Sequence, residues 1–226
     1  MKTFSIKEAY TVGWDRLKSG WQFVVVVMAS MLVVSSISNS IEKIDNPATV
    51  LVTLPLSLVS IWLTVNMIKG VFRIYDKHSM SPTSAFKWHS DSLRDGLKYI
   101  GIGIILGACF LVFLAPLAIL FVSALSGIYG LGVYDFVAAA LIILVGIYVN
   151  TRLMFAPYVM LDTNTGVFDS IKHSWKMSRG HVVKLLAFYA LSALLLILGF
   201  IILIIPGLIL SGVLVFATTH VYRELK

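Results

Sequence analysis

The sequence predicts an all-α polytopic membrane protein, with six transmembrane helices arranged as three hairpins, each preceded by an interfacial amphipathic helix. Hydrophobic residues make up 58% of the 226 residues and charged residues 13%, against about 45–50% and about 25% in soluble domains. A soluble fold cannot bury such an apolar excess, so the class is an integral membrane protein. Long uncharged stretches recur along the chain, and the Lys and Arg residues lie between alternate stretches.

The first unit begins with a capping box, in which Ser5 and Glu8 satisfy backbone N–H groups at a helix start. Apolar residues follow at helical spacing, so residues 1–20 are expected to form a short helix in the headgroup region. The stretch from Trp21 to Ile41 is uncharged and long enough to cross about 30 Å of hydrocarbon. It ends without a convincing cleavage site, so we interpret it as an uncleaved first span. A second uncharged stretch, from Asn46 to Ile68, is expected to return across the membrane.

The second unit is expected to begin at Ser81-Pro82, a pair typical of a helix N-terminus, and to form another interfacial helix. The uncharged stretch from Tyr99 to Tyr134 is too long for one span of about 20 residues. Its glycine-rich part, residues 126–132, is the expected turn between spans three and four, and span four is expected over residues 133–159. Within span three, Gly103 and Gly107 predict a close approach of two helices.

The third unit begins after the polar turn from Asp162 to Gly166. Phe168, Ile171 and Trp175 fall on one helical face, which predicts a basic amphipathic helix on the membrane surface. The last uncharged stretch, Leu185 to Tyr222, is again too long for one span. We expect a tight turn between Gly199 and Gly207, at Pro206-Gly207; because the sixth span is short, a re-entrant hairpin is the alternative.

Weak matches at a constant offset indicate an internal repeat within a single membrane domain, residues 1–226. Ala9 and Gly20 of the first unit correspond to Ala85 and Gly96 of the second. The expected units are residues 1–76, 77–160 and 161–226. Because each unit has an even number of spans, the three interfacial helices would lie on the same side of the membrane.

The distribution of cations predicts the orientation. With six spans, every Lys and Arg except Lys43 falls on one side. Short loops rich in Lys and Arg stay cytoplasmic, so both termini are expected inside. We therefore attribute the net charge of +7 to topology and anionic lipid rather than nucleic acid, because no basic soluble face with interleaved aromatic residues accompanies it.

Two sets of residues are candidates for a functional site. Four polar residues near the inner ends of spans suggest a vestibule open to the cytoplasm, because polar groups in membranes usually face a cavity or a partner: Asn66, Asn150, Arg152 and His220. The alternative is that these residues reach interfacial water. Four cations are expected to contact anionic lipid headgroups, at about 1 kcal/mol each, or to act only as topology determinants: Arg94, Lys172, Lys176 and Arg179.

Motifs of enzymes, metals and cofactors are missing from the sequence. It contains no metalloprotease helix, no nucleophile elbow and no phosphate-binding loop. The one cysteine, Cys109, lies in an apolar stretch and cannot form a disulfide within the chain. We therefore predict no catalytic residue, no cofactor and no metal ligand.

Loose motifs along nearly the whole chain carry a resemblance to a known group of proteins. They are Phe4-Ser5-Ile6-x-Glu8-Ala9 with Gly13-Trp14, the series Arg152, Asp162, Gly166, Ser174-Trp175 and Gly180, and Leu198-Gly199 with Ile205-Pro206-Gly207 and Tyr222. The chain resembles uncharacterised bacterial six-span membrane proteins related to the membrane domain of some glycerophosphodiester phosphodiesterases. The resemblance implies six helices in the cytoplasmic membrane. It implies no catalytic residue, because in the fused proteins the phosphodiesterase chemistry belongs to a separate soluble domain.

These observations favour a non-enzymatic membrane protein that acts through lipid or protein contacts at a basic cytoplasmic face. Its expected partners are anionic membrane lipids, with a membrane protein or a second copy as a further hypothesis, and no nucleic acid. The alternative is a small transporter or lipid-translocating protein that uses the polar vestibule. A membrane-embedded enzyme is a third hypothesis, and it requires polar residues from distant segments to converge in one pocket.

Overall fold

The computed structural model describes residues 4–44, 46–77, 81, 83, 86, 92–126 and 132–226. These residues are almost entirely helical and contain no strand, which confirms the predicted all-α class. The elements are α1 (Ile6–Glu42), the short 3-10 helix η1 (Pro47–Thr49), α2 (Val50–Lys77), α3 (Ser92–Ser126), α4 (Val133–Leu153), α5 (Ala156–Thr163), α6 (Val167–Met177), α7 (Val182–Ile202) and α8 (Ile204–Leu225). Within the described residues, six helices are long and apolar enough to cross a membrane.

The helices meet in what we call the hub, the part of the structure around an aromatic core. Phe72, Phe155, Phe188 and Tyr222 are buried there, brought together from α2, the α4–α5 junction, α7 and α8. The rings of Phe72 and Phe155 lie 5.7 Å and 6.1 Å from that of Tyr222. Such aromatic contacts contribute beyond the area they bury, so this core fixes the helix ends that carry the polar residues.

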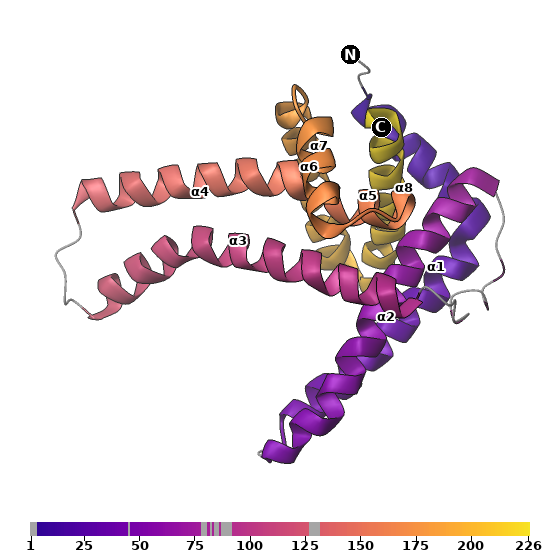
Figure 1. Ribbon diagram of the computed structural model, residues 1–226, viewed down its shortest axis with the longest axis horizontal. Helices are drawn as coiled ribbons and strands as arrows, with labels where there is room; N and C mark the ends of the chain where they lie inside the picture. Colours follow the sequence, from indigo (N-terminus) through magenta and orange to yellow (C-terminus); the bar gives the residue numbers. More distant parts are fainter. Residues whose placement is uncertain are drawn as a thin grey trace.

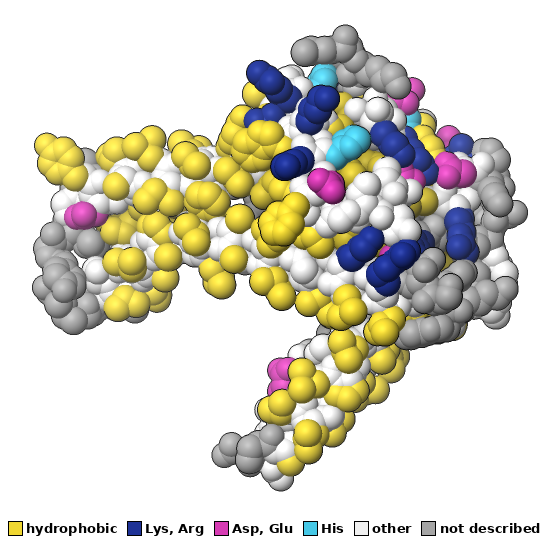
Figure 2. Space-filling view, in the orientation of Figure 1, with side chains coloured by type: hydrophobic (Ala, Val, Ile, Leu, Met, Phe, Trp, Pro, Cys, Tyr) yellow, Lys and Arg dark blue, Asp and Glu magenta, His cyan; other side chains and the backbone are white. Residues whose placement is uncertain are grey.

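Two apolar arms project from the hub in different directions (Figure 1). One arm is the α3–α4 pair and the other is the distal half of the α1–α2 pair. Large apolar side chains along them, such as Leu111, Phe121 and Leu51, are well exposed. Lys and Arg side chains gather on the hub in Figure 2, whereas the arms are covered with hydrophobic side chains. Exposed apolar surface on this scale is typical of helices that are surrounded by lipid.

Helix α1 differs from the expectation of a separate interfacial helix over residues 1–20. Residues Ile6–Glu42 form one continuous helix, capped by the Ser5 side chain, which accepts a hydrogen bond from the Glu8 backbone N–H. The stripe that includes Ala9, Gly13 and Leu17 is buried within the protein and contacts α8 instead of lying on headgroups. Small residues on the stripe permit α1 and α8 to approach closely. The same apolar spacing would suit a membrane surface, but here it packs one helix against another.

Substituting Gly13 with alanine is expected to destabilise the fold by about 2 kcal/mol, because an added methyl group overpacks the α1–α8 contact. A Cβ atom at Gly13 would lie 2.6 Å from the Val213 carbonyl oxygen and 3.1 Å from the Ala217 Cβ. The control is Gly103→Ala, because a Cβ there meets nothing within 4 Å. Thermal unfolding in detergent should show a lower Tm for Gly13→Ala and an unchanged or raised Tm for Gly103→Ala. Equal losses in both variants contradict this account of the packing.

The open surroundings of Gly103 and Gly107 correct the prediction of a close helix approach there. Apart from chain neighbours and the backbone of α3 itself, no atom of the described residues lies within 4 Å of a Cβ built at either glycine. The close approach along the α3–α4 pair lies instead at Gly146, where a Cβ would meet the Phe113 ring at 2.5 Å. The glycine spacing on α3 therefore did not indicate where α3 and α4 approach most closely, because the small residue at that contact belongs to α4.

The second predicted interfacial helix falls largely outside the described residues, as does most of the glycine-rich turn over residues 126–132. Span four is predicted over residues 133–159, and the structure has a candidate span over Tyr134–Thr163. It consists of two helices, because α4 ends at Leu153 and α5 begins at Ala156. Pro157 lies in the first turn of α5, where a missing N–H is tolerated. The helix is therefore interrupted just before Pro157, and residues up to Val159 belong to a second helix, α5.

The turn between α7 and α8 lies inside the predicted window but not at Pro206-Gly207. Leu203 is the single extended residue between the two helices, with φ −164° and ψ 154°. Pro206 lies in the first turn of α8, a position that suits proline. A Cβ at Gly199 would lie 3.2 Å from the Gly207 Cα, so these two glycines allow the helices to meet directly beside the turn.

Candidate functional site

Helix α6 carries two of the four cations expected to contact lipid, Lys172 and Lys176, and a third, Arg179, follows just after its end. Its local sequence suits a helix: Asp169 lies in the first turn and Lys176 in the last, so each charge opposes the helix-dipole charge at its end. The preceding helix, α5, ends at Asn164 with φ 55°, a left-handed conformation that asparagine tolerates. These features set the start of α6 directly after the predicted polar turn.

Lys98 of α3 fixes the turn between α5 and α6. Its ammonium group donates hydrogen bonds to the Asn164 carbonyl and side-chain oxygens, at 3.1 Å and 3.0 Å, and to the Thr165 carbonyl oxygen at 3.1 Å. A cation beside the last carbonyls of α5 satisfies groups that the helix itself leaves unpaired. Lys98 therefore caps the C-terminal end of α5. The sequence alone predicts only that Lys98 is one of the cations on the cytoplasmic side.

A seam of serines holds α6 against the hub. Ser170, Ser174 and Ser178 are buried and recur every four residues, on one face of the helix. The Ser174 hydroxyl donates to the Arg152 carbonyl oxygen at 2.7 Å, and the Ser178 hydroxyl reaches the same oxygen at 3.3 Å. The small side chains permit close contact, and Phe168 is left 75% exposed on the outside. The apolar residues of α6 are therefore divided: Met177 is buried and Val167 and Ile171 pack against the core, whereas Phe168 and Trp175 are exposed.

Arg152 forms the other half of this contact. It is buried, and its guanidinium donates to the Tyr148 hydroxyl at 2.9 Å and to the Trp175 carbonyl oxygen at 3.0 Å. The same group lies 4.3 Å from the centroid of the Trp175 ring and 5.4 Å from that of Tyr148. Cation–π contacts of this kind are worth about 2 kcal/mol when desolvated. Arg152 therefore joins α4 to α6 from inside the hub.

The outer side of α6 borders a basic groove of about 780 Å³. We call it the α6 groove, and it is lined by Asp169, Lys172, His173, Lys176, Met177, Arg179, His181, Leu225 and Lys226. Four Lys and Arg side chains face one carboxylate, so the groove has an excess of positive charge. Lys172 and Lys176 are four residues apart on the helix, a like-charge spacing that costs a few tenths of a kcal/mol unless an anion lies between them.

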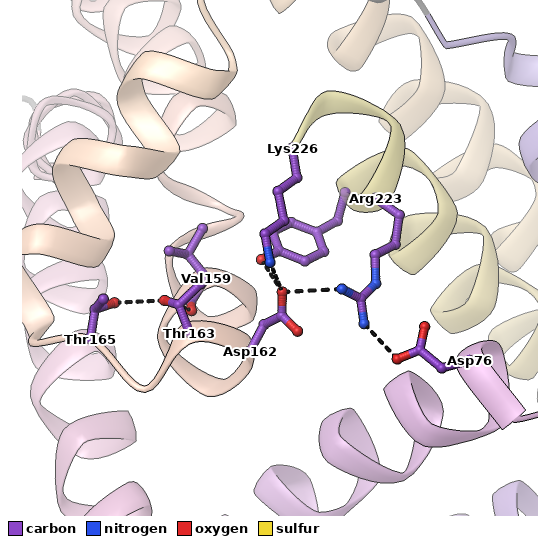
Figure 3. Close-up of polar contacts among 8 residues, drawn as sticks. Asp76, Val159, Asp162, Thr163, Thr165, Arg223 and Lys226 are labelled. Carbon is purple, nitrogen blue, oxygen red and sulfur yellow. Dashed lines mark hydrogen bonds and ion pairs between the residues drawn. The ribbon is translucent and has the colours of Figure 1, made fainter.

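Asp162 positions Lys226 in the lining of the α6 groove (Figure 3). The Asp162 carboxylate accepts hydrogen bonds from the Tyr222 hydroxyl at 2.8 Å, from Arg223 at 3.2 Å and from Lys226 at 2.5 Å. The second nitrogen of Arg223 donates to Asp76 of α2 at 2.9 Å. This cluster, which we call the Asp162 cluster, joins the C-terminal end of α8 to α5 and α2 and so sets one side of the groove.

The other predicted site residues lie elsewhere. Arg94 is exposed near the start of α3 and does not line the α6 groove. Asn66 and His220 are buried, and His220 Nδ1 lies 2.8 Å from the Tyr75 hydroxyl. Asn150 lines an apolar cavity between α3, α4 and α7. The α6 groove and this cavity do not contain Asn66, Arg152 or His220, so neither gathers the four vestibule residues.

Sequence reasoning missed the serine seam, Lys226 and Asp162 as parts of the site. The spacing of Ser170, Ser174 and Ser178 was a readable signal, because small residues four apart mark a helix contact. The placement of Lys226 beside α6 depends on contacts between segments far apart in the chain. No pattern of local spacing could have indicated it.

Comparisons of the chain with protein-family models, with curated proteins and with solved structures find no match. The resemblance to six-span membrane domains stays a prediction.

Proposed function

We propose that this chain is a non-enzymatic, multi-pass protein of a bacterial cytoplasmic membrane that binds anionic lipid headgroups in the α6 groove. The hub lies at the cytoplasmic face, with both termini inside. One observation carries the proposal: three of the four cations expected to contact lipid line one groove together with Lys226. Phosphate groups of lipids supply the negative charge that this groove lacks.

The contacts of α6 support this role because they hold the helix rigidly from its inner side. The serine seam and Arg152 occupy the hub-facing side, so Lys172, Lys176 and Arg179 need not contribute to docking. Within the described residues these three cations form no ion pair with a carboxylate of the chain. They are thus available to phosphate, while Phe168 and Trp175 are suited to the interface beside them.

The proposed membrane placement would put the two apolar arms in contact with lipid. In Figure 1 they point in different directions, and little else in the chain packs along them. Lipid around the arms would cover their exposed apolar side chains.

The double substitution Lys172→Gln and Lys176→Gln is expected to weaken binding of a short-chain phosphatidylglycerol about 25-fold. The reason is that each cation near an anionic headgroup contributes about 1 kcal/mol, or about fivefold. The measurement is titration of the detergent-solubilised protein, with short-chain phosphatidylcholine as the neutral reference. Lys43→Gln is the control, because Lys43 follows α1 at the end of its arm, away from the hub. An unchanged preference for phosphatidylglycerol in the double variant contradicts the proposal.

A small transporter with a cytoplasmic vestibule has less support. Its four predicted residues are not gathered by the groove or by the cavity that Asn150 lines, and the guanidinium of Arg152 is engaged with Tyr148 and Trp175. The α6 groove therefore remains the better-supported site.

A further inference from the structure

The α6 groove carries more positive charge than one lipid phosphate neutralises. Among the described residues, Lys172, Lys176 and Arg179 form no ion pair with a carboxylate of the chain. Lys226 is already paired with a carboxylate, and Asp169 is the one acidic residue in the described lining. The three unpaired cations and this carboxylate leave two positive charges in excess. A phosphodiester lipid such as phosphatidylglycerol brings only one negative charge.

The unpaired cations are also spread along the groove. Lys176 lies one helical turn after Lys172, and Arg179 lies three residues further on. The Arg179 backbone N–H donates to the Lys176 carbonyl oxygen at 3.2 Å, so the chain is still coiled there although α6 ends at Met177. At about 1.5 Å per residue the row is about 10 Å long, which exceeds the width of a single phosphate group. Because like charges repel, cations spaced along this row favour two anions at separate points over one anion at a single point.

The groove has room and further donors for two phosphates. Its volume of about 780 Å³ is in the upper half of the range for ligand sites, about 300–1,000 Å³. His173 and His181 line it and offer ring N–H donors, and Lys226 offers its ammonium group from the end of α8. Phe168 and Trp175 are exposed on the same helix. Aromatic side chains of this kind suit the membrane interface, so the acyl chains of a bound lipid have apolar side chains beside them.

We propose that the α6 groove binds a lipid that carries two phosphodiester groups, as cardiolipin does, in preference to a lipid that carries one. One phosphate lies between Lys172 and Lys176, and the other lies at Arg179. This preference, which rests on the proposed function, specifies the headgroup for the same groove. Once one phosphate is bound, the second is held close to its own position, so the linked pair binds more tightly than two separate phosphodiester lipids.

Phosphatidic acid is the nearest competitor for the groove. Its phosphomonoester carries a charge of about −1.5 to −2 at pH 7, which also matches the excess charge of the lining. That charge is concentrated on one phosphate, which leaves one end of the row of cations without an anion. The spacing of the cations, rather than their number, therefore favours the lipid with two phosphates.

The test is titration of the full-length protein in detergent with short-chain cardiolipin, phosphatidylglycerol and phosphatidic acid, compared at equal phosphate concentration. We expect cardiolipin to bind at least about tenfold more tightly than either of the other two lipids. Binding of phosphatidylglycerol without a preference for cardiolipin overturns this inference and leaves the proposed function standing. If neither lipid binds better than phosphatidylcholine, both are overturned. Equal or tighter binding of phosphatidic acid overturns the assignment of two phosphates.

Arg179→Gln separates the two phosphate positions. We expect about fivefold weaker binding of cardiolipin, which is the contribution of one cation beside an anionic headgroup. Binding of phosphatidylglycerol should not change, because its single phosphate lies between Lys172 and Lys176. Arg94→Gln is the matched control and should change neither affinity, because Arg94 is exposed near the start of α3 and does not line the groove. Equal effects of Arg179→Gln on the two lipids contradict separate phosphate positions.

Discussion

Replacing Asp162 with alanine is expected to lower the free energy of unfolding by about 3 kcal/mol, because it leaves Lys226 and the Tyr222 hydroxyl without their shared acceptor, while Arg223 keeps only Asp76. The Asp162 side chain is only 12% exposed, and it accepts hydrogen bonds from Tyr222, Arg223 and Lys226. Loss of the carboxylate should release the C-terminal turns of α8 first. The measurement is chemical denaturation in detergent, combined with hydrogen exchange of α8.

Asp76→Ala is the matched control for this prediction. Asp76 binds the same guanidinium of Arg223 at 2.9 Å, but its side chain is 54% exposed. Exposed ion pairs are worth about 0–1 kcal/mol, so this variant should lose no more than that. Equal effects of the two substitutions contradict the view that Asp162 is the organising acceptor.

Replacing Arg152 with alanine is expected to cost about 3 kcal/mol and to detach α6 from α4. The substitution removes two charge-assisted hydrogen bonds and two ring contacts, while it relieves the burial of a charge. The Trp175 carbonyl oxygen also loses its side-chain donor. Hydrogen exchange in α6, Val167–Met177, should accelerate by about two orders of magnitude, and exchange in the α1–α8 contact should not change.

Two further substitutions at this position separate charge from geometry. Arg152→Lys keeps the charge but lacks the planar, forked donor, so it should recover less than half of the loss. Arg152→Met keeps apolar packing between the rings without any donor, and it should leave α6 poorly protected. Full protection of α6 in the methionine variant contradicts a docking role for the guanidinium.

The six long helices were predictable because each corresponds to an uncharged stretch long enough to cross a membrane, and such stretches are recognised from composition alone. The concentration of cations at the hub followed from the same spacing, and α6 begins directly after the predicted polar turn. These features depend on local composition. They therefore do not require knowledge of which helices touch.

The N-terminal part of α1 shows why other features were not predictable. Ala9, Gly13 and Leu17 form an apolar stripe that suits either a membrane surface or a neighbouring helix, and only the small size of Gly13 favours the second. Similarly, Leu203 breaks the chain between α7 and α8 although Pro206 and Gly207 are the stronger turn formers. Gly199 lies against Gly207 beside this turn, and such packing partners are not visible in a single sequence.

Only part of the lining of the α6 groove could be predicted from the sequence. Lys172 and Lys176 share α6 and Arg179 follows its end by two residues, so their proximity follows from the sequence. Lys226 joins them only because the Asp162 cluster holds the end of α8 beside α5.

Site-directed labelling of single cysteines tests the membrane placement most directly. With Cys109 replaced by serine, cysteines are introduced in place of Lys7, Lys43 and Lys176, and a membrane-impermeant maleimide is applied to intact and to opened cells. Our account predicts that the positions of Lys7 and Lys176 react only after opening, whereas that of Lys43 reacts in intact cells. Reaction at the positions of Lys43 and Lys176 from the same side of the membrane contradicts it.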